Sequence, residues 1–277
     1  MPRKINRYFL KLKIIKYLSN DLKYDKNEKD LIIDFLKNNP LAIFPYNFTK
    51  KYRRKDVKVY TDDLCGMKYI IQDHKRLYFK KSWGEKRIKK YYSVLLSEQD
   101  IDSPHCYENP NFCVNKDDIV VDAGVAEGNF ALSIIEKVKK IYLFEADEEW
   151  IDVLKTTFAP WKEKVEIICK YVSDNDENGN ITLDSFFKTG KIDFIKTDIE
   201  GEEIKLLKGS RNILTNNNRI KTVMAAYHNQ NDAEEINKIL NKYGFKCEYS
   251  KGYMLFLNDK KLCEPYLRKG LVRGIKI

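Results

Sequence analysis

Segment 119–128 reads Ile119-Val-Val-Asp-Ala-Gly-Val-Ala-Glu-Gly128, an apolar run that ends in an acid and is followed by a glycine-containing turn. The apolar run predicts a short buried strand. Gly124 and Gly128 allow a tight turn and the close approach of a ligand, and a helix after the turn offers free N–H groups to an anion. The spacing is G-x-x-x-G, which differs from the G-x-G-x-x-G of dinucleotide enzymes. It therefore argues against NAD and favours a ligand that lacks a pyrophosphate.

From residue 118 onward, predicted strands alternate with predicted helices. The strands are 119–122, 140–145, 165–168, 192–196 and 220–227, the helices are 129–138, 148–158, 201–214 and 232–243, and 245–257 is expected to form a hairpin around Lys251-Gly252. This alternation predicts an α/β fold with a mainly parallel sheet covered on both faces. Ligands of such sheets bind at the carboxyl ends of the strands, where the strand order reverses.

The first 110 residues have another pattern and are predicted to form an α+β accessory region. Helices are expected at 3–18, 27–38 and 84–97, and short strands within 57–81, with turns at Asp62-Asp63 and Asp73-His74. The predicted α/β domain covers 111–258. Residues 259–277 are predicted to be a basic tail, either solvated or closing over an anionic acceptor.

The net charge of +10 resides in the N-terminal part of the chain. Residues 1–60 hold 16 basic and 6 acidic residues, so the remaining residues balance to zero. A basic end favours an anionic partner, such as a membrane surface, nucleic acid or charged glycan, although a general bias toward lysine explains it equally well. Helix 3–18 could lie on a membrane surface, but docking on its own protein is the favoured interpretation.

The cysteine pattern indicates a reducing compartment. Six cysteines are scattered without a C-x-x-C pair and no signal peptide precedes them, which predicts reduced thiols in the cytoplasm. No apolar run approaches the roughly 20 residues that span a bilayer.

An acid at the end of the second predicted strand makes the glycine turn more informative. Glu145 follows Asp122 by 23 residues, close to the spacing at which nucleoside-binding folds place the acid that accepts both ribose hydroxyls. Asp122 and Glu145 together predict a nucleoside site.

Four ionisable residues follow the fourth predicted strand: Lys196, Asp198, Glu200 and Glu202. Alternation puts the first three on one face, where they could converge on a pocket, orient a hydroxyl and tune one another's pKa values. Glu203 is expected only to favour the N-terminus of the next helix.

Several motifs together resemble the FkbM family of S-adenosylmethionine (SAM)-dependent methyltransferases. The resemblance is carried by Val120-Val-Asp-Ala-Gly-Val-Ala-Glu-Gly-Asn-Phe130, Phe144-Glu-Ala-Asp147, Thr182-Leu-Asp184, Phe194-Ile-Lys-Thr-Asp-Ile-Glu-Gly-Glu202 and Ala226-Tyr-His228. It implies a Rossmann-like domain with a mainly parallel seven-stranded sheet. It also implies SAM as cofactor, S-adenosylhomocysteine as product and O-methylation of a sugar or polyketide hydroxyl, often in surface-polysaccharide biosynthesis.

The resemblance also implies roles for individual residues. Asp122, Gly124 and Glu127 would bind the methionine end of SAM, Glu145 would bind the ribose and Ser173 would lie near the adenine. Gly128 and Asp198 are further candidate cofactor contacts. The family often has Asn where this chain has Ala126.

The acceptor side of the site is predicted from polar and aromatic residues. His228, after the fifth strand, is the candidate base because histidine titrates near neutral pH, and Lys196, Asp198 and Glu200 would assist it. His105, Tyr107 and Glu202 are the candidate acceptor contacts, and residues 1–110 are the candidate acceptor-binding region. Asp198, Glu200 and His228 are metal-ligand types, but no tightly spaced ligand motif exists, so no metal is predicted.

The leading hypothesis is a sugar O-methyltransferase. An RNA methyltransferase that uses the basic N-terminus is the alternative within enzymes, although charge alone supports nucleic acid. A non-catalytic nucleoside-binding scaffold is the alternative outside enzymes. The sequence does not indicate an oligomeric state.

Overall fold

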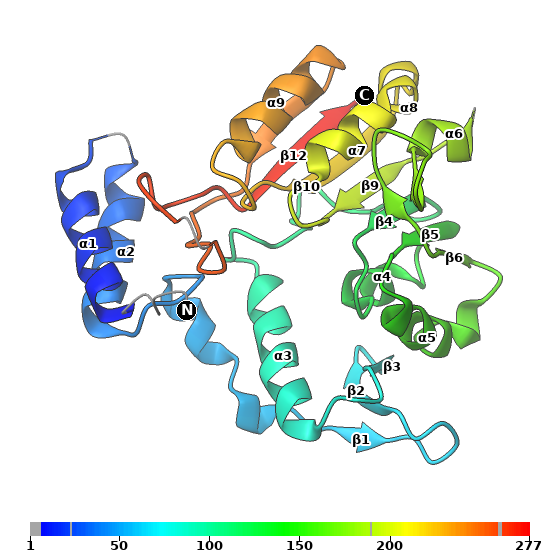
Figure 1. Ribbon diagram of the computed structural model, residues 1–277, viewed down its shortest axis with the longest axis horizontal. Helices are drawn as coiled ribbons and strands as arrows, with labels where there is room; N and C mark the ends of the chain where they lie inside the picture. The colour runs from blue at the N-terminus through cyan, green and yellow to red at the C-terminus, as the bar shows by residue number, and fades with distance from the viewer. Residues whose placement is uncertain (1–6, 23, 189, 260–261) are drawn as a thin grey trace.

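The computed structural model describes residues 7–22, 24–188, 190–259 and 262–277. At its centre lies a seven-stranded sheet with the order β11-β12-β10-β9-β4-β5-β6 (Figure 1). The parallel neighbours are β10 (Ile220–Ala225), β9 (Phe194–Thr197), β4 (Ile119–Ala123), β5 (Lys140–Phe144) and β6 (Val165–Ile168). β12 (Leu271–Lys276) runs antiparallel between β10 and β11 (Lys246–Tyr249). The predicted α/β fold with a mainly parallel seven-stranded sheet is confirmed.

Alternation along the strands explains how both faces of the sheet are covered. Val120 and Phe194 belong to one hydrophobic cluster, whereas their neighbours Val121 and Ile195 belong to another. Successive side chains of a strand point to opposite faces, so each apolar strand feeds two cores. The first cluster includes residues of α4 (Asn129–Ile134) and α5 (Glu148–Thr157). The second includes residues of α6 (Leu183–Phe187), α7 (Glu203–Gly209), α8 (Arg211–Asn216) and α9 (Asp232–Lys242).

The N-terminal part contains the predicted helices and short strands. The structure has α1 (Arg7–Asn20), α2 (Lys26–Asn38), the 3₁₀ turns Asn47–Lys51 and Arg54–Asp56, β1 (Tyr60–Thr61), β2 (Lys68–Gln72), β3 (Lys75–Tyr78) and α3 (Glu85–Glu98). Asp73 and His74 have positive φ in the tight turn between β2 and β3, as their turn prediction requires. Residues 3–6 of the predicted helix 3–18 lie outside the described residues.

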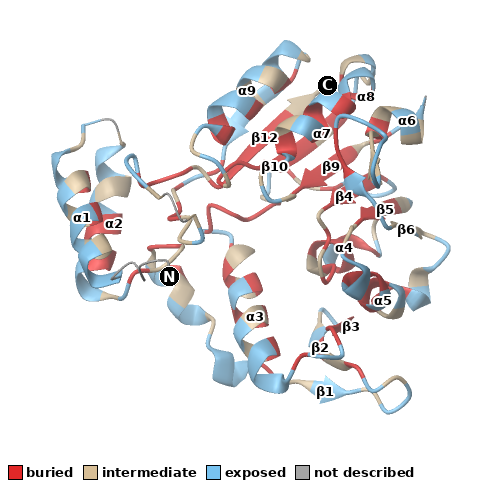
Figure 2. Ribbon diagram, viewed as in Figure 1, coloured by how far each residue is buried: buried red, intermediate tan, exposed pale blue. Residues whose placement is uncertain are grey.

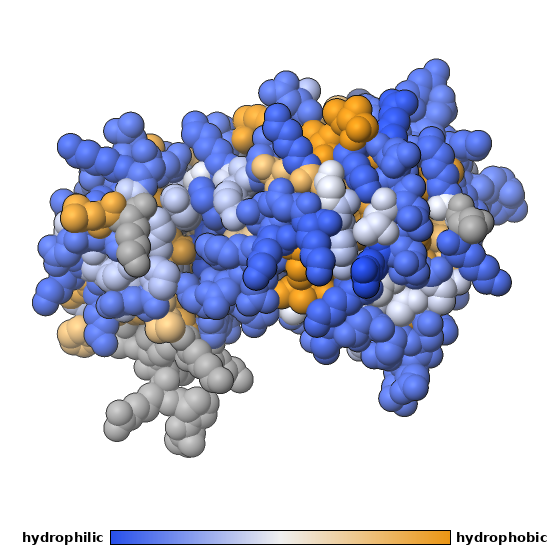
Figure 3. All heavy atoms as spheres, turned by 90° about the horizontal axis from the view of Figure 1, so that it is seen from above, coloured by the Kyte–Doolittle hydropathy of each residue, from blue (hydrophilic) through white to orange (hydrophobic). Residues whose placement is uncertain are grey.

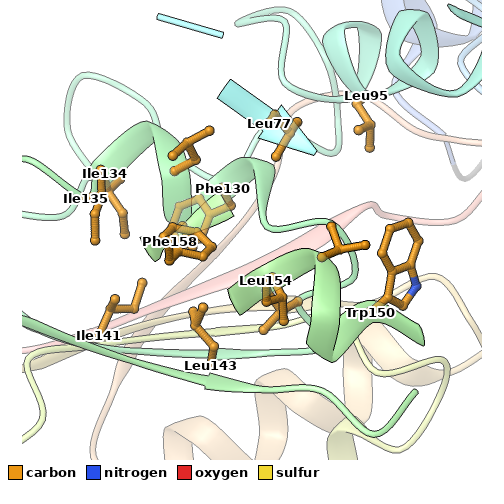
Figure 4. Packing of buried hydrophobic residues seen from close by; sticks show 14 of the residues in the cluster. Leu77, Leu95, Phe130, Ile134, Ile135, Ile141, Leu143, Trp150, Leu154 and Phe158 are labelled. Atoms are coloured by element: carbon orange, nitrogen blue, oxygen red, sulfur yellow. The ribbon is translucent and has the colours of Figure 1, made fainter. Parts of the chain in front are cut away.

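The accessory region does not have one core of its own. Leu77 of β3 and Leu95 of α3 lie in the same cluster as Phe130 of α4 and Leu154 of α5 (Figure 4). Figure 2 shows the buried side of α3 turned toward the sheet domain. α1 and α2 pack instead against residues 255–267, to form a separate cluster. Residues 57–98 are therefore structurally continuous with the sheet domain.

The predicted hairpin at 245–257 is wrong. β11 pairs with β12, and the described residues between them reach α1 and α2, where Leu255, Tyr266 and Leu267 pack (Figure 1). Turn residues such as Lys251-Gly252 show only that the chain turns and do not specify which strand β11 pairs with. The pairing with β12 is favoured because it buries the apolar side chains of β12, of which Leu271 and Val272 are fully buried.

The predicted basic tail is also wrong for residues 268–276. β12 lies inside the sheet, and Arg268 and Arg273 are buried. Their guanidinium groups form hydrogen bonds within the protein: Arg268 donates to the carbonyls of Tyr227 and His228, and Arg273 donates to that of Cys106. Burial lowers the pKa of Arg273. Arg268 and Arg273 thus link the C-terminal segment to residues 227–228 and to Cys106.

Smaller differences concern short elements. The predicted helix 201–214 divides into α7 and α8 at Ser210, and the sequence did not predict β7 (Tyr171–Val172), β8 (Asn180–Ile181), the 3₁₀ turn Ala159–Trp161 or α6. At Gly209 the helix passes so close to the chain that a Cβ would lie 2.0 Å from the carbonyl oxygen of Ser173. Close packing at this glycine accompanies the break.

Candidate active site

The turn after β4 lies where the strand order reverses between β4 and β9, the position at which α/β sheets bind ligands. Gly124 has φ +76°, and a Cβ there would lie 1.9 Å from the carbonyl oxygen of Asp198. The turn therefore requires glycine both for its conformation and for its contact with the end of β9. Gly128, with φ +89°, precedes α4, and a Cβ there would meet the ring of Phe158 at 2.9 Å.

A buried ion pair fixes this turn. Lys196 Nζ lies 2.8 Å from Asp122 Oδ1 and donates to the carbonyl of Gly124 at 2.7 Å. Burial lowers the pKa of Lys196, but the charges of Asp122 and Asp198 outweigh it and the pKa is raised. The structure thus places Lys196 beneath the turn, where it positions the backbone. Asp122 Oδ2 is buried and accepts no hydrogen bond from the described residues.

A cavity of about 590 Å³ opens beside the turn, within the size range typical of small-ligand sites. Its wall combines apolar side chains with both charges. The lining residues include the apolar Ala126, Phe144, Trp150, Val172 and Ile199, the acids Glu145, Asp147, Asp198, Glu200 and Glu202, and the bases Lys170 and Lys205. Acids outnumber bases in this lining, which favours a cationic ligand over a phosphate.

Glu145 is held rigidly at the cavity wall. Its Oε2 accepts the backbone N–H of Ala126 and its Oε1 that of Asp147, each at 2.8 Å. Each oxygen keeps a lone pair for a further donor. The carboxylate is therefore preorganised to accept hydroxyl groups from a ligand in the cavity.

Asp198 is the centre of a second group of residues at the cavity edge. Tyr107 donates to its Oδ2 at 2.8 Å, Tyr227 donates to its Oδ1 at 3.0 Å, and His105 Nε2 lies 3.3 Å from Oδ2. Burial raises the pKa of Asp198, but the hydrogen bond and charge of His105, with Lys196 and His228, outweigh it and hold that pKa well below its usual range. Asp198 is therefore a fixed anion. Burial, then the charge of Asp198, raises the pKa of both tyrosines, which keeps their hydroxyls protonated.

His228 connects Asp198 to a buried glutamate. Its Nδ1 lies 3.2 Å from Glu203 Oε1, and its Nε2 lies 3.5 Å from Asp198 Oδ1. Glu203 Oε1 also accepts the backbone N–H of Ile199 at 2.9 Å. The expectation that Glu203 only favours a helix terminus is wrong, because the side chain is fully buried against His228. A carboxylate that faces one imidazole nitrogen fixes the ring and its tautomer.

Two further carboxylates, those of Glu98 and Glu127, lie near Asp198. Glu98 was not among the predicted site residues, and Glu127 does not lie where the prediction placed it. Burial, with the charges of Asp198 and Glu127, raises the pKa of Glu98 to about 7. Glu127 is buried and accepts a hydrogen bond from Tyr91 of α3 at 2.7 Å. The structure thus turns Glu127 toward α3, rather than toward the cavity beside Gly124.

The structure brings some predicted site residues together and separates others. Among the described residues, the cavity lining includes Gly124, Glu145, Ser173, Asp198, Glu200 and Glu202. Asp122, Glu127, Gly128 and Lys196 lie behind it. His105 and Tyr107 are buried beside Asp198, and His228, which is only partly buried, lies on its other side.

The alternation argument does not extend to Glu200. β9 ends at Thr197, and Glu200 is exposed with φ +56°. Glu202 is half-exposed and forms an ion pair with Lys205 at 2.6 Å. Both acids therefore lie at the rim of the cavity.

Sequence reasoning did not assign a site role to Tyr227 or Glu203, and it expected Glu98 only as part of a polar segment that could cap the pocket. Tyr227 adjoins His228 in the sequence, which is a usable signal. The burial of Glu203 against His228 has no local sequence signature.

Asp198, Glu203 and His228 are metal-ligand types that lie close together. Each offers one ligand atom, and these atoms lie within 4.8 Å of one another. The set contains Glu203 where the sequence had suggested Glu200.

The seven-stranded sheet, the glycine turn after β4 and the cavity at the carboxyl edge are the features of a Rossmann-like methyltransferase. The profile of the Methyltransferase FkbM domain matches residues 104–247, slightly more than half of the chain. This chain belongs to the FkbM methyltransferase family. A search of curated proteins gave no match.

Solved structures with a similar arrangement are distant in sequence. Methyltransferase FkbM from Methylobacillus flagellatus KT gives a TM-score of 0.48 at 16% identity, over 69% of this chain and 53% of that chain. This chain thus spans about half the length of that structure. Trm5b from Pyrococcus abyssi gives 0.44 at 12% identity, over 80% and 63% of the two chains. The M. jannaschii tRNA m1G37 methyltransferase gives 0.44 at 15% identity, over 76% and 57%.

Proposed function

We propose that this protein is a SAM-dependent O-methyltransferase that acts on a hydroxyl of a sugar in a surface glycan or its precursor, with S-adenosylhomocysteine as product. The observation that carries the proposal is the position of Glu145 and Asp198 on the wall of one cavity, with His228 directly behind Asp198. Glu145 suits the ribose of a nucleoside, and Asp198 with His228 suits an acceptor hydroxyl that must lose its proton.

The residues present fit SAM. Glu145 would accept the ribose hydroxyls, and Phe144, Val172 and Ser173 would surround the adenine. The unpartnered Oδ2 of Asp122 leaves an acceptor close to the turn, and the acidic lining favours a cation. When bound, SAM supplies a methyl group on a positively charged sulfonium.

An alcohol acceptor must lose its proton as the new bond to oxygen forms, and His228 is the proposed base. Glu203 would orient the imidazole through Nδ1, so that Nε2 faces the acceptor side near Asp198. A positioned base of this kind contributes roughly 10²–10⁴-fold to a rate. Asp198 would stabilise the protonated imidazole by its negative charge.

The acceptor is proposed to enter from the side of residues 1–110. His105 and Tyr107 come from the segment between α3 and β4 and reach Asp198 directly. Their hydrogen-bonding groups suit a neutral, hydroxyl-rich acceptor, as does Glu202 at the rim. In this proposal residues 111–258 together with β12 form the catalytic domain.

The first test measures the cofactor. Isothermal titration of the full chain with SAM and S-adenosylhomocysteine is expected to show binding that falls roughly tenfold or more in Glu145→Ala, because two hydroxyl bonds are lost. Glu163→Ala, at an exposed position outside the cavity, is the matched control. Absence of SAM binding in the unaltered protein would favour the non-catalytic scaffold.

The second test identifies the acceptor. Transfer of a radiolabelled methyl group is measured to nucleotide sugars and oligosaccharides in parallel with total RNA. Labelled sugar with alkali-stable ether linkage is the expected result. Label in RNA alone, with steep salt dependence, would replace the sugar proposal by the RNA alternative.

A further inference from the structure

The outward face of α1 carries apolar side chains that are largely exposed. Ile14 and Leu18 are fully buried and form the inner face of the helix with α2. Tyr8, Phe9 and Leu12 are 62%, 61% and 44% exposed. At 100° per residue, Phe9 and Leu12 lie on the side opposite to Ile14 and Leu18, and Tyr8 lies at the flank of that side. Apolar residues on both sides of a helix indicate that its outer side has another apolar environment.

Cations lie among these apolar residues. Lys13 and Lys16 are exposed and follow Phe9 and Leu12 by one helical turn. The α1 sequence has four basic residues and no acid, and residues 1–60 hold all of the net positive charge. Aromatic rings, leucine and lysines on one helical surface are the composition of helices that lie in a bilayer interface.

We propose that the outward face of α1, defined by Tyr8, Phe9, Leu12, Lys13 and Lys16, binds the surface of an anionic lipid bilayer. The apolar side chains would enter the headgroup region and the lysines would contact anionic headgroups. The described part of the chain contains no helix that could span a bilayer.

The arrangement of the aromatic rings favours lipid over nucleic acid. Tyr8 and Phe9 pack edge to face, with centroids 5.9 Å apart and an angle of 74°, whereas bases stack on ring faces arranged along a strand. Leu12 contributes nothing to phosphate binding but adds to the area that lipid would cover.

The position of α1 is compatible with this contact. α1 lies at the end of the molecule away from the seven-stranded sheet (Figure 1), and hydrophobic residues reach the surface at that end (Figure 3). The cavity is lined by residues 124–205, so a bilayer at α1 would leave it accessible. The proposal concerns location and does not depend on the reaction.

The test is co-sedimentation of the full chain with vesicles that contain about 30 mol% phosphatidylserine in phosphatidylcholine, compared with vesicles of phosphatidylcholine alone. Two variants alter the outward face of α1: Tyr8→Ser/Phe9→Ser/Leu12→Ser, and Lys13→Glu/Lys16→Glu. Two matched controls alter exposed residues elsewhere: Leu64→Ser/Ile101→Ser, and Lys238→Glu/Lys242→Glu on α9. Thermal unfolding of each variant checks that it folds.

Binding to the anionic vesicles is expected, with a loss of about tenfold or more in each α1 variant and none in the controls. Both the lysines and the apolar side chains are expected to contribute to vesicle binding. Binding should therefore weaken when the salt concentration is raised and also in the triple apolar variant. No binding to anionic vesicles, or unchanged binding by folded α1 variants, would overturn the proposal. So would binding to poly(U) that survives the apolar change while vesicles are not bound.

Discussion

The imidazole of His228 lies between two carboxylates, with Nδ1 3.2 Å from Glu203 Oε1 and Nε2 3.5 Å from Asp198 Oδ1. Glu203 is fully buried and Asp198 is partly exposed. Burial alone would lower the pKa of His228, but the hydrogen bond and charge of Glu203, followed by the charge of Asp198, outweigh it and raise that pKa.

Glu203→Gln is expected to lower the pKa of His228, because the amide still lies beside Nδ1 but carries no charge. Since Glu203 raises the folded-state pKa, its stabilising effect is present at low pH and is lost as pH rises through that pKa. The chain has three histidines, so an NMR titration resolves each ring. Glu202→Gln, at the exposed neighbouring position, should leave the pKa of His228 unchanged. An unchanged His228 pKa in the Glu203 variant would contradict the pairing.

His228→Ala is expected to lower turnover by roughly 10²–10⁴-fold while SAM affinity stays unchanged, because the base acts on the acceptor. Methyl transfer and isothermal titration measure the two quantities separately. His74→Asn is the control, since His74 is exposed with positive φ and Asn tolerates that conformation. Near-normal turnover would remove His228 from the mechanism.

Exhaustive chelation is expected to leave methyl transfer unchanged, because proton removal by the proposed base, His228, requires no metal. Activity is measured after dialysis against EDTA and after addition of Mg²⁺. Loss with EDTA and recovery with Mg²⁺ would instead assign Asp198, Glu203 and His228 to a cation.

Gly124→Ala is expected to destabilise the fold far more than Gly66→Ala. Both glycines have similar positive φ, +76° and +70°, but a Cβ at 124 meets the Asp198 carbonyl at 1.9 Å and one at 66 meets nothing within 4 Å. The strained φ costs roughly 1–2 kcal/mol in each variant, and the clash adds roughly 1–3 kcal/mol at 124. Urea unfolding measures both. Equal decreases in the free energy of unfolding of the two variants would show that the backbone at 124 can shift to accommodate the Cβ, and would contradict the prediction.

Glu98→Gln is expected to stabilise the protein above neutral pH. Burial raises the pKa of Glu98 from 4.5 to about 7, so the folded state binds its proton more tightly and loses stability as pH rises between these values. The loss approaches about 3 kcal/mol at most, at 1.36 kcal/mol per pKa unit. Melting temperatures from pH 4 to 8 should therefore decline less steeply in the variant. Parallel curves for the two proteins would refute this role of Glu98.

The parts of the fold that depend on local pattern were predictable. The five parallel strands, the turns at Asp73-His74 and after Asp122, and the main helices follow from hydrophobic period and turn residues, which act over a few neighbouring positions. Glu145 and Asp198 were also recognisable, because each directly follows an apolar strand.

The sequence alone therefore determined the class of fold, the glycine turn and the acids at the strand ends. Only the tertiary structure decided that β12 inserts between β10 and β11, that Lys196 lies beneath the turn, and that Glu203 and Tyr227 surround His228 and Asp198. The physical reason is that these outcomes depend on burial between segments distant in the chain. Whether a basic or acidic side chain is solvated or paired in the interior is set by the neighbours that packing supplies.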